Sequence, residues 1–226
     1  MLPTYRQQKL RMHIPQWGFR GGLVVVALCA WFWTQALIGK RAFPEGRIGD
    51  AVLDFTAPLN RYLLDHPTWA NRLLIVTSGL IDLLGIFIVG LAIFGPSLRP
   101  FLGLIILFSL RQLCQGLCAL PPPEGMIWRH PGFPSLLVTY GTASDLFFSG
   151  HTAIAVYGCL ELAHFAGSIG VAVGAAIAAI EVCTVLILRA HYTMDVFTGA
   201  VAALWVWTMA SYLAPKLDSL IAALLS

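Results

Sequence analysis

Long apolar runs dominate the chain, and short polar segments separate them. Six of the runs are long enough to cross a bilayer as helices, since a hydrocarbon core requires about 20 helical residues. They cover residues 19–38, 73–94, 101–120, 146–166, 169–188 and 192–214. The pattern therefore predicts an all-α integral membrane bundle of six transmembrane helices.

Composition supports this class. Of the 226 residues, 58% are hydrophobic and 11% are charged, as in multi-span membrane proteins. A net charge of +3 gives no indication of a nucleic-acid partner. All five cysteines fall inside apolar runs, so the spacing predicts no disulfide framework.

Six crossings would place both termini on one side of the membrane. Residues 1–18 form a basic tail that carries Arg6, Lys9 and Arg11 and no acidic residue, which predicts a cytosolic position. Residues 19–214 form a single membrane domain, and residues 215–226 a short amphipathic tail.

Two long loops are expected on the side opposite the termini. The first, 39–72, contains "AVLDFTAPLNRYLL" and is predicted to lie along the interface as an amphipathic helix. The second, 121–144, reads "PPPEGMIWRHPGFPSLLVTYGTAS" and is rich in Pro and Gly. Loops of this length are more often functional lids than connectors.

Two polar clusters interrupt the apolar pattern: "DLFFSGHTAI" at 145–154 and "LILRAHYTMDVF" at 186–197. The spans that carry His151 and His191 run in the same direction, so the two imidazoles are expected on one membrane face. His191 and Asp195 are four residues apart, which places them on one helical face within hydrogen-bonding reach. A carboxylate on one ring nitrogen fixes the tautomer and makes the other nitrogen a better base or nucleophile.

The first cluster also provides an anion site. Ser149 and Gly150 begin a helix, where backbone N–H groups and the helix dipole favour negative charge. With Arg189 added, these parts suit phosphoryl transfer, in which one histidine attacks phosphorus and the other protonates the leaving oxygen.

Several residues have simpler interpretations. A histidine in a membrane helix is more often a hydrogen-bonded core residue, and H-x-x-x-D could be a metal pair, although no third ligand lies at suitable spacing. Arg111, Asp82 and Glu181 fall inside spans, where they would form either a structural ion-pair cluster or part of a site. The aromatic residues near the active face, namely Trp128, Tyr140 and Tyr192, would be interfacial anchors or a cation–π site for a quaternary ammonium.

The motifs carry a family resemblance over residues 59–214. "SGHT" followed by "HYTMDV" resembles the signatures of the sphingomyelin synthase-related family, within the lipid phosphate phosphatase superfamily. Arg111, followed after eight residues by Leu-Pro-Pro-Pro at 120–123, is similar to the family's R-x8-L-P-x-P element. Asp145 matches the aspartate that precedes S-G-H-T in sphingomyelin synthases. "RAHYTMD" and the general layout also resemble the plant phosphatidylcholine:diacylglycerol cholinephosphotransferases.

The resemblance implies a lipid phosphate phosphatase-like core that transfers a head group through a phosphohistidine. His191 would be the nucleophile, Asp195 its orienter, and His151 the acid and then the base. The phosphate and head group would be bound by Ser149, Gly150, Arg189, Arg111, Asp145 and Tyr192. No metal or other cofactor is expected. The donor would be a phosphatidylcholine or phosphatidylethanolamine, and the acceptor diacylglycerol or ceramide.

One motif of ordinary lipid phosphatases, lysine-x6-arginine-proline, is absent. A phosphomonoester is nearly a dianion and benefits from several cations, whereas a phosphodiester carries one charge. The departure favours a diester donor. A lipid phosphate phosphatase and a non-catalytic membrane scaffold or transporter stay open as alternatives, as does a homo-oligomer. The active site is expected on the exoplasmic face, either lumenal or periplasmic.

Overall fold

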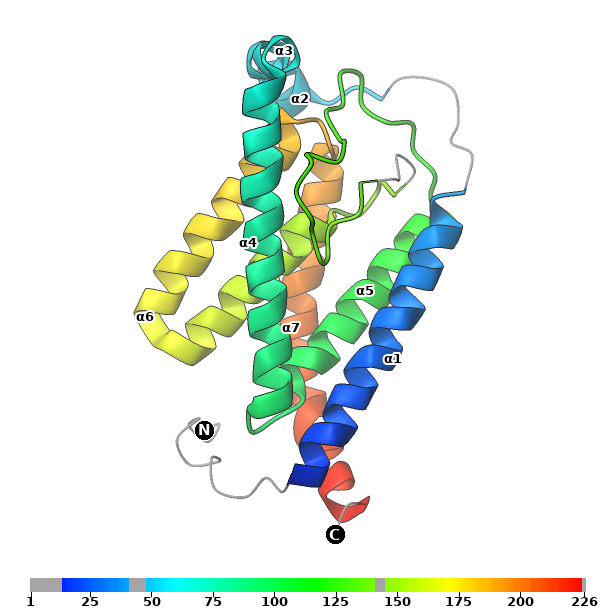
Figure 1. Ribbon diagram of the computed structural model, residues 1–226, viewed down its shortest axis with the longest axis vertical. Helices are drawn as coiled ribbons and strands as arrows, with labels where there is room; N and C mark the ends of the chain where they lie inside the picture. The colour runs from blue at the N-terminus through cyan, green and yellow to red at the C-terminus, as the bar shows by residue number, and fades with distance from the viewer. Residues whose placement is uncertain (1–13, 41–47, 141–144, 225–226) are drawn as a thin grey trace.

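The computed structural model describes residues 14–40, 48–140 and 145–224 of the chain (Figure 1). All of its regular elements within these ranges are helices. They are α1 (Ile14–Ile38), α2 (Ala51–Phe55), α3 (Ala57–Asp65), α4 (Pro67–Phe94), α5 (Arg99–Leu117), α6 (Gly150–Ile187) and α7 (Thr193–Leu224). The all-α class is confirmed.

Five of these helices, α1, α4, α5, α6 and α7, are long and apolar enough to cross a membrane. The 38-residue α6 is a hairpin rather than a straight rod, since it reverses direction at Gly167 (Figure 1). Gly167 has φ 61° and ψ −135°, a conformation that residues with a Cβ rarely adopt. The predicted spans 146–166 and 169–188 thus correspond to the two arms of one element. Whether each arm crosses the membrane, for six crossings in total, stays a prediction.

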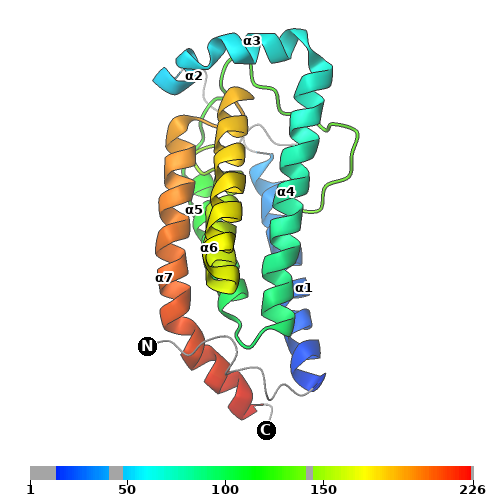
Figure 2. The ribbon, with the colours of Figure 1, turned by 90° about the vertical axis from the view of Figure 1, so that its left-hand side faces the viewer.

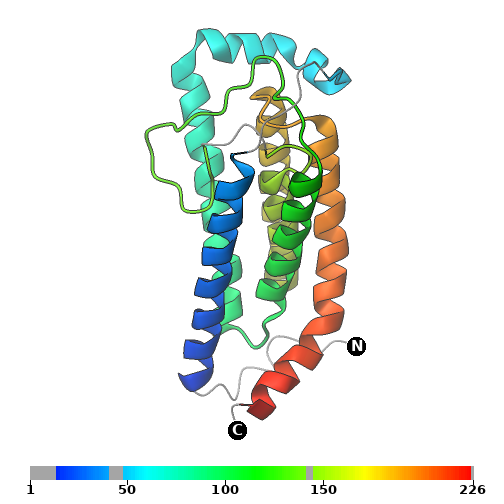
Figure 3. The ribbon, with the colours of Figure 1, turned by 90° about the vertical axis from the view of Figure 1, so that its right-hand side faces the viewer.

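The two arms of α6 approach closely because small residues line their contact. A Cβ on Gly174 would come within 2.5 Å of the Cα of Cys159 on the facing arm. The first arm packs on α4 and α7, and α5 packs on α7. In the centre of this bundle, Ile88, Leu107, Phe148, Tyr157 and Val206 form a buried cluster. Helix α1 lies at the edge of the bundle, beside α4 and α5 (Figure 3).

Helices α2 and α3 lie across the end of the bundle that is opposite the first residues of α1 and the last residues of α7 (Figure 2). They occupy the segment predicted to be amphipathic, and Phe55, Leu59 and Tyr62 expose large apolar side chains there. The helical part of that prediction is confirmed, whereas its position at a membrane interface stays a prediction. Helix α4 begins at Pro67, six residues before the predicted span, because the chain turns directly from α3 into it.

The segment 118–149 between α5 and α6 contains no helix or strand in its described part, and it covers the same end of the bundle (Figure 1). The Asp82 carboxylate on α4 accepts hydrogen bonds from the backbone N–H groups of Leu136 (2.8 Å) and Leu137 (2.9 Å). Near its other end, the Ile127 N–H donates to the Leu188 carbonyl over 2.8 Å. We call this segment the covering loop.

Of the two alternatives for Arg111, Asp82 and Glu181, the structure does not form the ion-pair cluster. Arg111 pairs with Asp145, and Asp82 holds the covering loop. Neither carboxylate oxygen of Glu181 has a hydrogen-bond partner in the described part of the chain. Helices that are apolar on most sides give no sequence signal for their rotation, so the pattern could not say which charges face each other.

The predicted chain ends are only partly described. Helix α7 continues through Pro215 to Leu224, so the tail predicted from residue 215 is the last part of this helix. The first 13 residues of the predicted basic tail lie outside the described residues. Helix α1 already begins at Ile14, five residues before the predicted span.

Candidate active site

A small cavity lies under the covering loop, where the start of α6 meets the turn that precedes α7. Its lining includes His151, His191, Arg111, Asp145 and Trp128. The two polar clusters of the sequence therefore meet in one place, as the parallel direction of their helices predicts. Besides the covering loop and the turn that carries Ala190 and His191, the walls come from helices, which hold side chains more rigidly than loops do.

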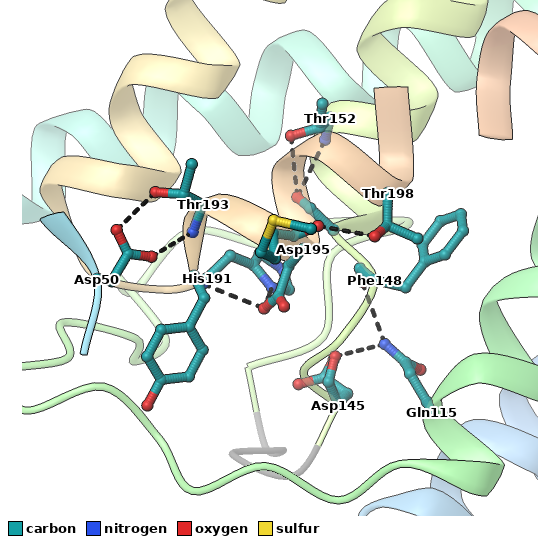
Figure 4. A network of polar contacts seen from close by, with 12 residues as sticks. Asp50, Gln115, Asp145, Phe148, Thr152, His191, Thr193, Asp195 and Thr198 are labelled. Atoms are coloured by element: carbon teal, nitrogen blue, oxygen red, sulfur yellow. Dashed lines mark hydrogen bonds and ion pairs between the residues drawn. The ribbon is translucent and has the colours of Figure 1, made fainter. Parts of the chain in front are cut away.

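His191 is held by a buried carboxylate. Its Nδ1 lies 3.1 Å from Oδ2 of Asp195, a residue in the first turn of α7 with no exposed surface (Figure 4). The backbone N–H of Tyr192 donates to the same oxygen over 3.1 Å. When Nδ1 donates to the carboxylate, Nε2 carries the free lone pair. The arrangement thus leaves Nε2 of His191 as the ring nitrogen with the free lone pair.

The two motifs are joined through the backbone. The N–H of Ser149 donates to the carbonyl oxygen of Asp195 over 3.0 Å. Gly199, one turn further along α7, allows this contact, since a Cβ there would come within 2.6 Å of the Ser149 carbonyl. The start of α6 is consequently fixed relative to the start of α7.

His151 lies in the first turn of α6 and is held mainly by packing. Its ring makes an edge-to-face contact with Trp128, with ring centroids 5.2 Å apart. Its Nε2 has no hydrogen-bond partner in the described residues. Ser149 is the N-cap of α6, as the predicted helix start implies, and its hydroxyl accepts from Thr152 N over 3.3 Å. Its binding of phosphate stays a prediction. Gly150, by contrast, does line the cavity.

Arg111 is the centre of a buried polar triangle. It donates from Nη2 to Oδ2 of Asp145 over 2.9 Å and from Nη1 to Oε1 of Gln35 over 2.6 Å. The Gln35 amide donates in turn to Asp145 over 3.4 Å. The remaining Nε of Arg111 has no partner among the described residues, and it lies 3.1 Å from where a Cβ on Gly150 would be. This edge of the guanidinium therefore lies next to the first turn of α6.

Gln35 and Gln115 were not singled out from the sequence. Gln35 is 3% exposed and comes from α1, and Gln115 is fully buried on α5. The Gln115 amide donates to the carbonyl oxygens of Asp145 and Phe148 (Figure 4). It thereby braces Phe147, whose φ of 79° is unfavourable for a residue with a side chain. A polar residue inside each apolar run was the available signal.

Arg189 and Tyr192, both predicted to bind the head group, do not line the histidine cavity. Arg189 has φ 53°, and its guanidinium donates to the backbone carbonyl oxygens of Glu124 and Leu53. The hydroxyl of Tyr192 donates to the Pro121 carbonyl over 3.0 Å. Both side chains line a separate hollow near α2. Both side chains thus hold loops around the site, and their binding of the head group stays a prediction.

Asp50 is a further residue that the sequence did not indicate. Its carboxylate accepts from the backbone N–H (2.6 Å) and the hydroxyl (2.7 Å) of Thr193, the first residue of α7 (Figure 4). Burial raises the pKa of this carboxyl, but the hydrogen bonds from Thr193 and from the α2 backbone outweigh burial and hold the pKa below its ordinary value. Asp50 thus ties α2 to the helix that carries Asp195.

No group of three or more His, Cys, Asp or Glu side chains suited to a metal ion occurs in the part of the chain that the structure describes. The predicted independence from metals stays a prediction.

The match to a known family covers most of the chain. The model of AtPDCT1/2, the phosphatidylcholine:diacylglycerol cholinephosphotransferase family, matches residues 49–212. The chain belongs to this family. The match to the cholinephosphotransferase family includes His151, His191 and Asp195, and it leaves α1 and Gln35 outside. No curated protein and no solved structure matches the chain.

Proposed function

We propose that the protein transfers phosphocholine between phosphatidylcholine and diacylglycerol within a membrane. The observation that carries this proposal is the meeting of His151, His191 and Arg111 in one cavity, with Asp195 bound to Nδ1 of His191. Membership of the cholinephosphotransferase family supports the choice of substrates, and it favours diacylglycerol over ceramide as the acceptor.

In the first step, Nε2 of His191 attacks the phosphorus of the donor lipid. A P–N bond forms as the bond between phosphorus and the diacylglycerol oxygen breaks, and His151 gives its proton to that oxygen. Asp195 keeps Nδ1 protonated and stabilises the positive charge that develops on the ring of His191. The products are free diacylglycerol and a phosphocholine group on His191.

In the second step, a different diacylglycerol enters. His151, now neutral, takes the proton from its hydroxyl, and the oxygen attacks phosphorus as the P–N bond breaks. This returns His191 to its starting state and His151 to its protonated state. Atoms and charge balance over the cycle without a further reactant.

The charges of the cavity fit a phosphodiester. Among the described residues that line it, Arg111 is the one Arg or Lys, and its charge is already offset by Asp145. A phosphodiester adds one negative charge, whereas a phosphomonoester would add nearly two and call for several cations. Because Arg189 faces elsewhere, the cavity has fewer cations than the sequence predicted, which strengthens the argument for a diester.

We further propose six crossings, with each arm of α6 counted as one, and an exoplasmic active site. The covering loop, α2 and α3 gather at the end of the bundle opposite the start of α1 (Figure 1). A cytosolic basic tail would then place the site on the other side.

The test is a transfer assay with purified protein in lipid vesicles. The donor is phosphatidylcholine labelled in its head group, and the acceptor is unlabelled diacylglycerol of different acyl composition. Labelled phosphatidylcholine with the new acyl chains should form faster than free phosphocholine is released. If phosphatidic acid is dephosphorylated readily while the exchange does not occur, the protein is a phosphatase and the proposal is wrong. Absence of both reactions would indicate a non-catalytic protein.

A further inference from the structure

A second and larger cavity, of about 570 Å³, lies between α1, α4 and α5. We call it the α1–α4–α5 groove. Its lining is almost entirely apolar, with Val24, Ala27 and Leu28 on α1 and Phe101, Leu104 and Ile105 on α5. A cavity of this size and character is typical of a ligand site.

The groove lies directly beside the histidine cavity. Trp31, Phe108, Leu137 and Ile154 line both spaces, so only these shared side chains separate them. The rings of Trp31 and Phe108 lie with centroids 5.1 Å apart. A molecule that reaches His191 with one end therefore needs only a shift of these shared side chains to extend into the groove with the other.

Polar atoms without partners mark the junction of the two spaces. Both amide atoms of Gln112 and Nε1 of Trp31 are buried and have no hydrogen-bond partner in the described part of the chain. Both residues line the groove. Unpaired buried polar groups are costly, and they are often explained by a ligand or function. An amide N–H and an indole N–H both suit an ester carbonyl.

Along α5 the lining groups change from polar to apolar, as the groups of a glycerolipid do. Arg111 lines the histidine cavity, and the adjacent Gln112 lines the groove. From Gln112 the groove follows α5 down to Phe101, about 16 Å at 1.5 Å per residue. It ends at Val24 and Phe101, which belong to a buried apolar cluster with Leu98 and Ile221. The path thus runs from the polar groups of Arg111 and Gln112, near the end of α5, to purely apolar residues near its start.

We infer that the α1–α4–α5 groove holds one acyl chain of the glycerolipid, with an ester carbonyl at Gln112 and Trp31. This inference rests on the proposed function for the position of the head group. It adds that α1, which lies outside the family match, forms one wall of the lipid site and influences which chain lengths are accepted.

Photo-crosslinking tests the position of the chain. Phosphatidylcholine with a diazirine at the end of one acyl chain should label Val24, Ala27, Phe101 or Leu104, both in the wild-type protein and in His191→Ala. The comparison site is Val25, which is 60% exposed on the outer side of α1. Labelling of Val25 as strong as that of Ala27, or labelling only elsewhere, would show ordinary bilayer contact and overturn the inference.

Turnover gives a second measurement. Ala27→Trp should lower kcat/KM about 10-fold or more with a long-chain phosphatidylcholine, because several methylene groups lose their site, and about 2-fold or less with a dihexanoyl donor. The matched control, Val25→Trp, should change neither. If Ala27→Trp folds and kcat/KM falls equally with both donors, the inference is contradicted. If the variant does not fold, the crosslinking result decides. Crosslinks in the groove without any transfer would refute the proposed function alone.

Discussion

The two histidines of the site have different supports, although they share one cavity. His191 is bound by the fully buried Asp195, which defines its tautomer. His151 has no carboxylate partner among the described residues and is held by Trp128 and by its place in the first turn of α6. A nucleophile benefits from a lone pair that is fixed on one nitrogen. A general acid–base needs a nitrogen that is free to donate a proton when the ring is protonated and to accept one when the ring is neutral. The difference supports the proposed roles, in which His191 is the nucleophile and His151 transfers the proton.

Removal of His191 should have the largest effect. With His191→Ala, transfer should fall by about 10⁴-fold or more, because no bond to phosphorus can form. One measurement is the exchange of labelled phosphocholine between lipids. The other is the amount of labelled phosphocholine that stays bound to the protein after the reaction is quenched without acid, which would cleave the P–N bond. His191→Ala should trap none.

His151→Ala is the matched variant that would break the comparison. It should slow exchange by about 10²–10⁴-fold, the usual contribution of general acid–base catalysis. With a donor whose leaving group needs no proton, such as nitrophenyl phosphocholine, His151→Ala should still load the protein with phosphocholine. If His151→Ala fails to load and His191→Ala succeeds, the two roles are reversed.

Asp195→Asn should slow both steps by about 10²–10⁴-fold, because the amide favours the wrong tautomer of His191. Loading from nitrophenyl phosphocholine and discharge to diacylglycerol can be timed separately by rapid quenching. A loss confined to discharge would mean that Asp195 acts on the acceptor, and the comparison of the two histidines would fail.

The sequence predicted the meeting of these residues for a simple reason. Helix direction follows from counting spans, so His151 and His191 had to reach the same end of the bundle. Helix rotation and loop paths do not follow from counting. Arg189 turns away because its φ is positive, and no residue pattern in "LRAHYT" reports this.

The Arg111 triangle shows the same limit. The sequence indicated Arg111 and Asp145 by resemblance. Gln35, which completes the triangle, comes from a helix far away in the chain, and its only sequence signal is an amide inside an apolar run. The two predicted spans 146–166 and 169–188 already implied a reversal of the chain between them, although no polar loop joins them. Glycine alone makes so tight a turn possible.

Gln35→Leu should have a smaller effect, and it tests the His151 side of the cavity. The variant leaves Arg111 with Asp145 but removes the bond to Gln35, and we expect kcat/KM for phosphatidylcholine to fall about 10-fold, as for one charge-assisted hydrogen bond. Gln35→Glu should recover part of the loss, since it keeps an acceptor for Arg111. Trp33→Leu, 66% exposed on the same helix, should be neutral. Equal losses in both variants would indicate that α1 matters only for folding.

The smallest effect is expected for Asp50→Asn, on the His191 side. Asp50 holds the first residue of α7, so its loss should loosen the position of Asp195 and reduce loading of His191 only about 2- to 5-fold, as for one partly buried hydrogen bond. The sign of the pH dependence follows from the lowered pKa of Asp50. Its stabilising contribution is complete above the unfolded value of about 3.9 and disappears as the pH falls through the lower folded value. The difference in Tm between wild type and Asp50→Asn should therefore be constant from about pH 8 to pH 5 and shrink only below about pH 4. A difference that already disappears near pH 6 would point to a histidine instead, and Asp50 would then have no part in positioning α7.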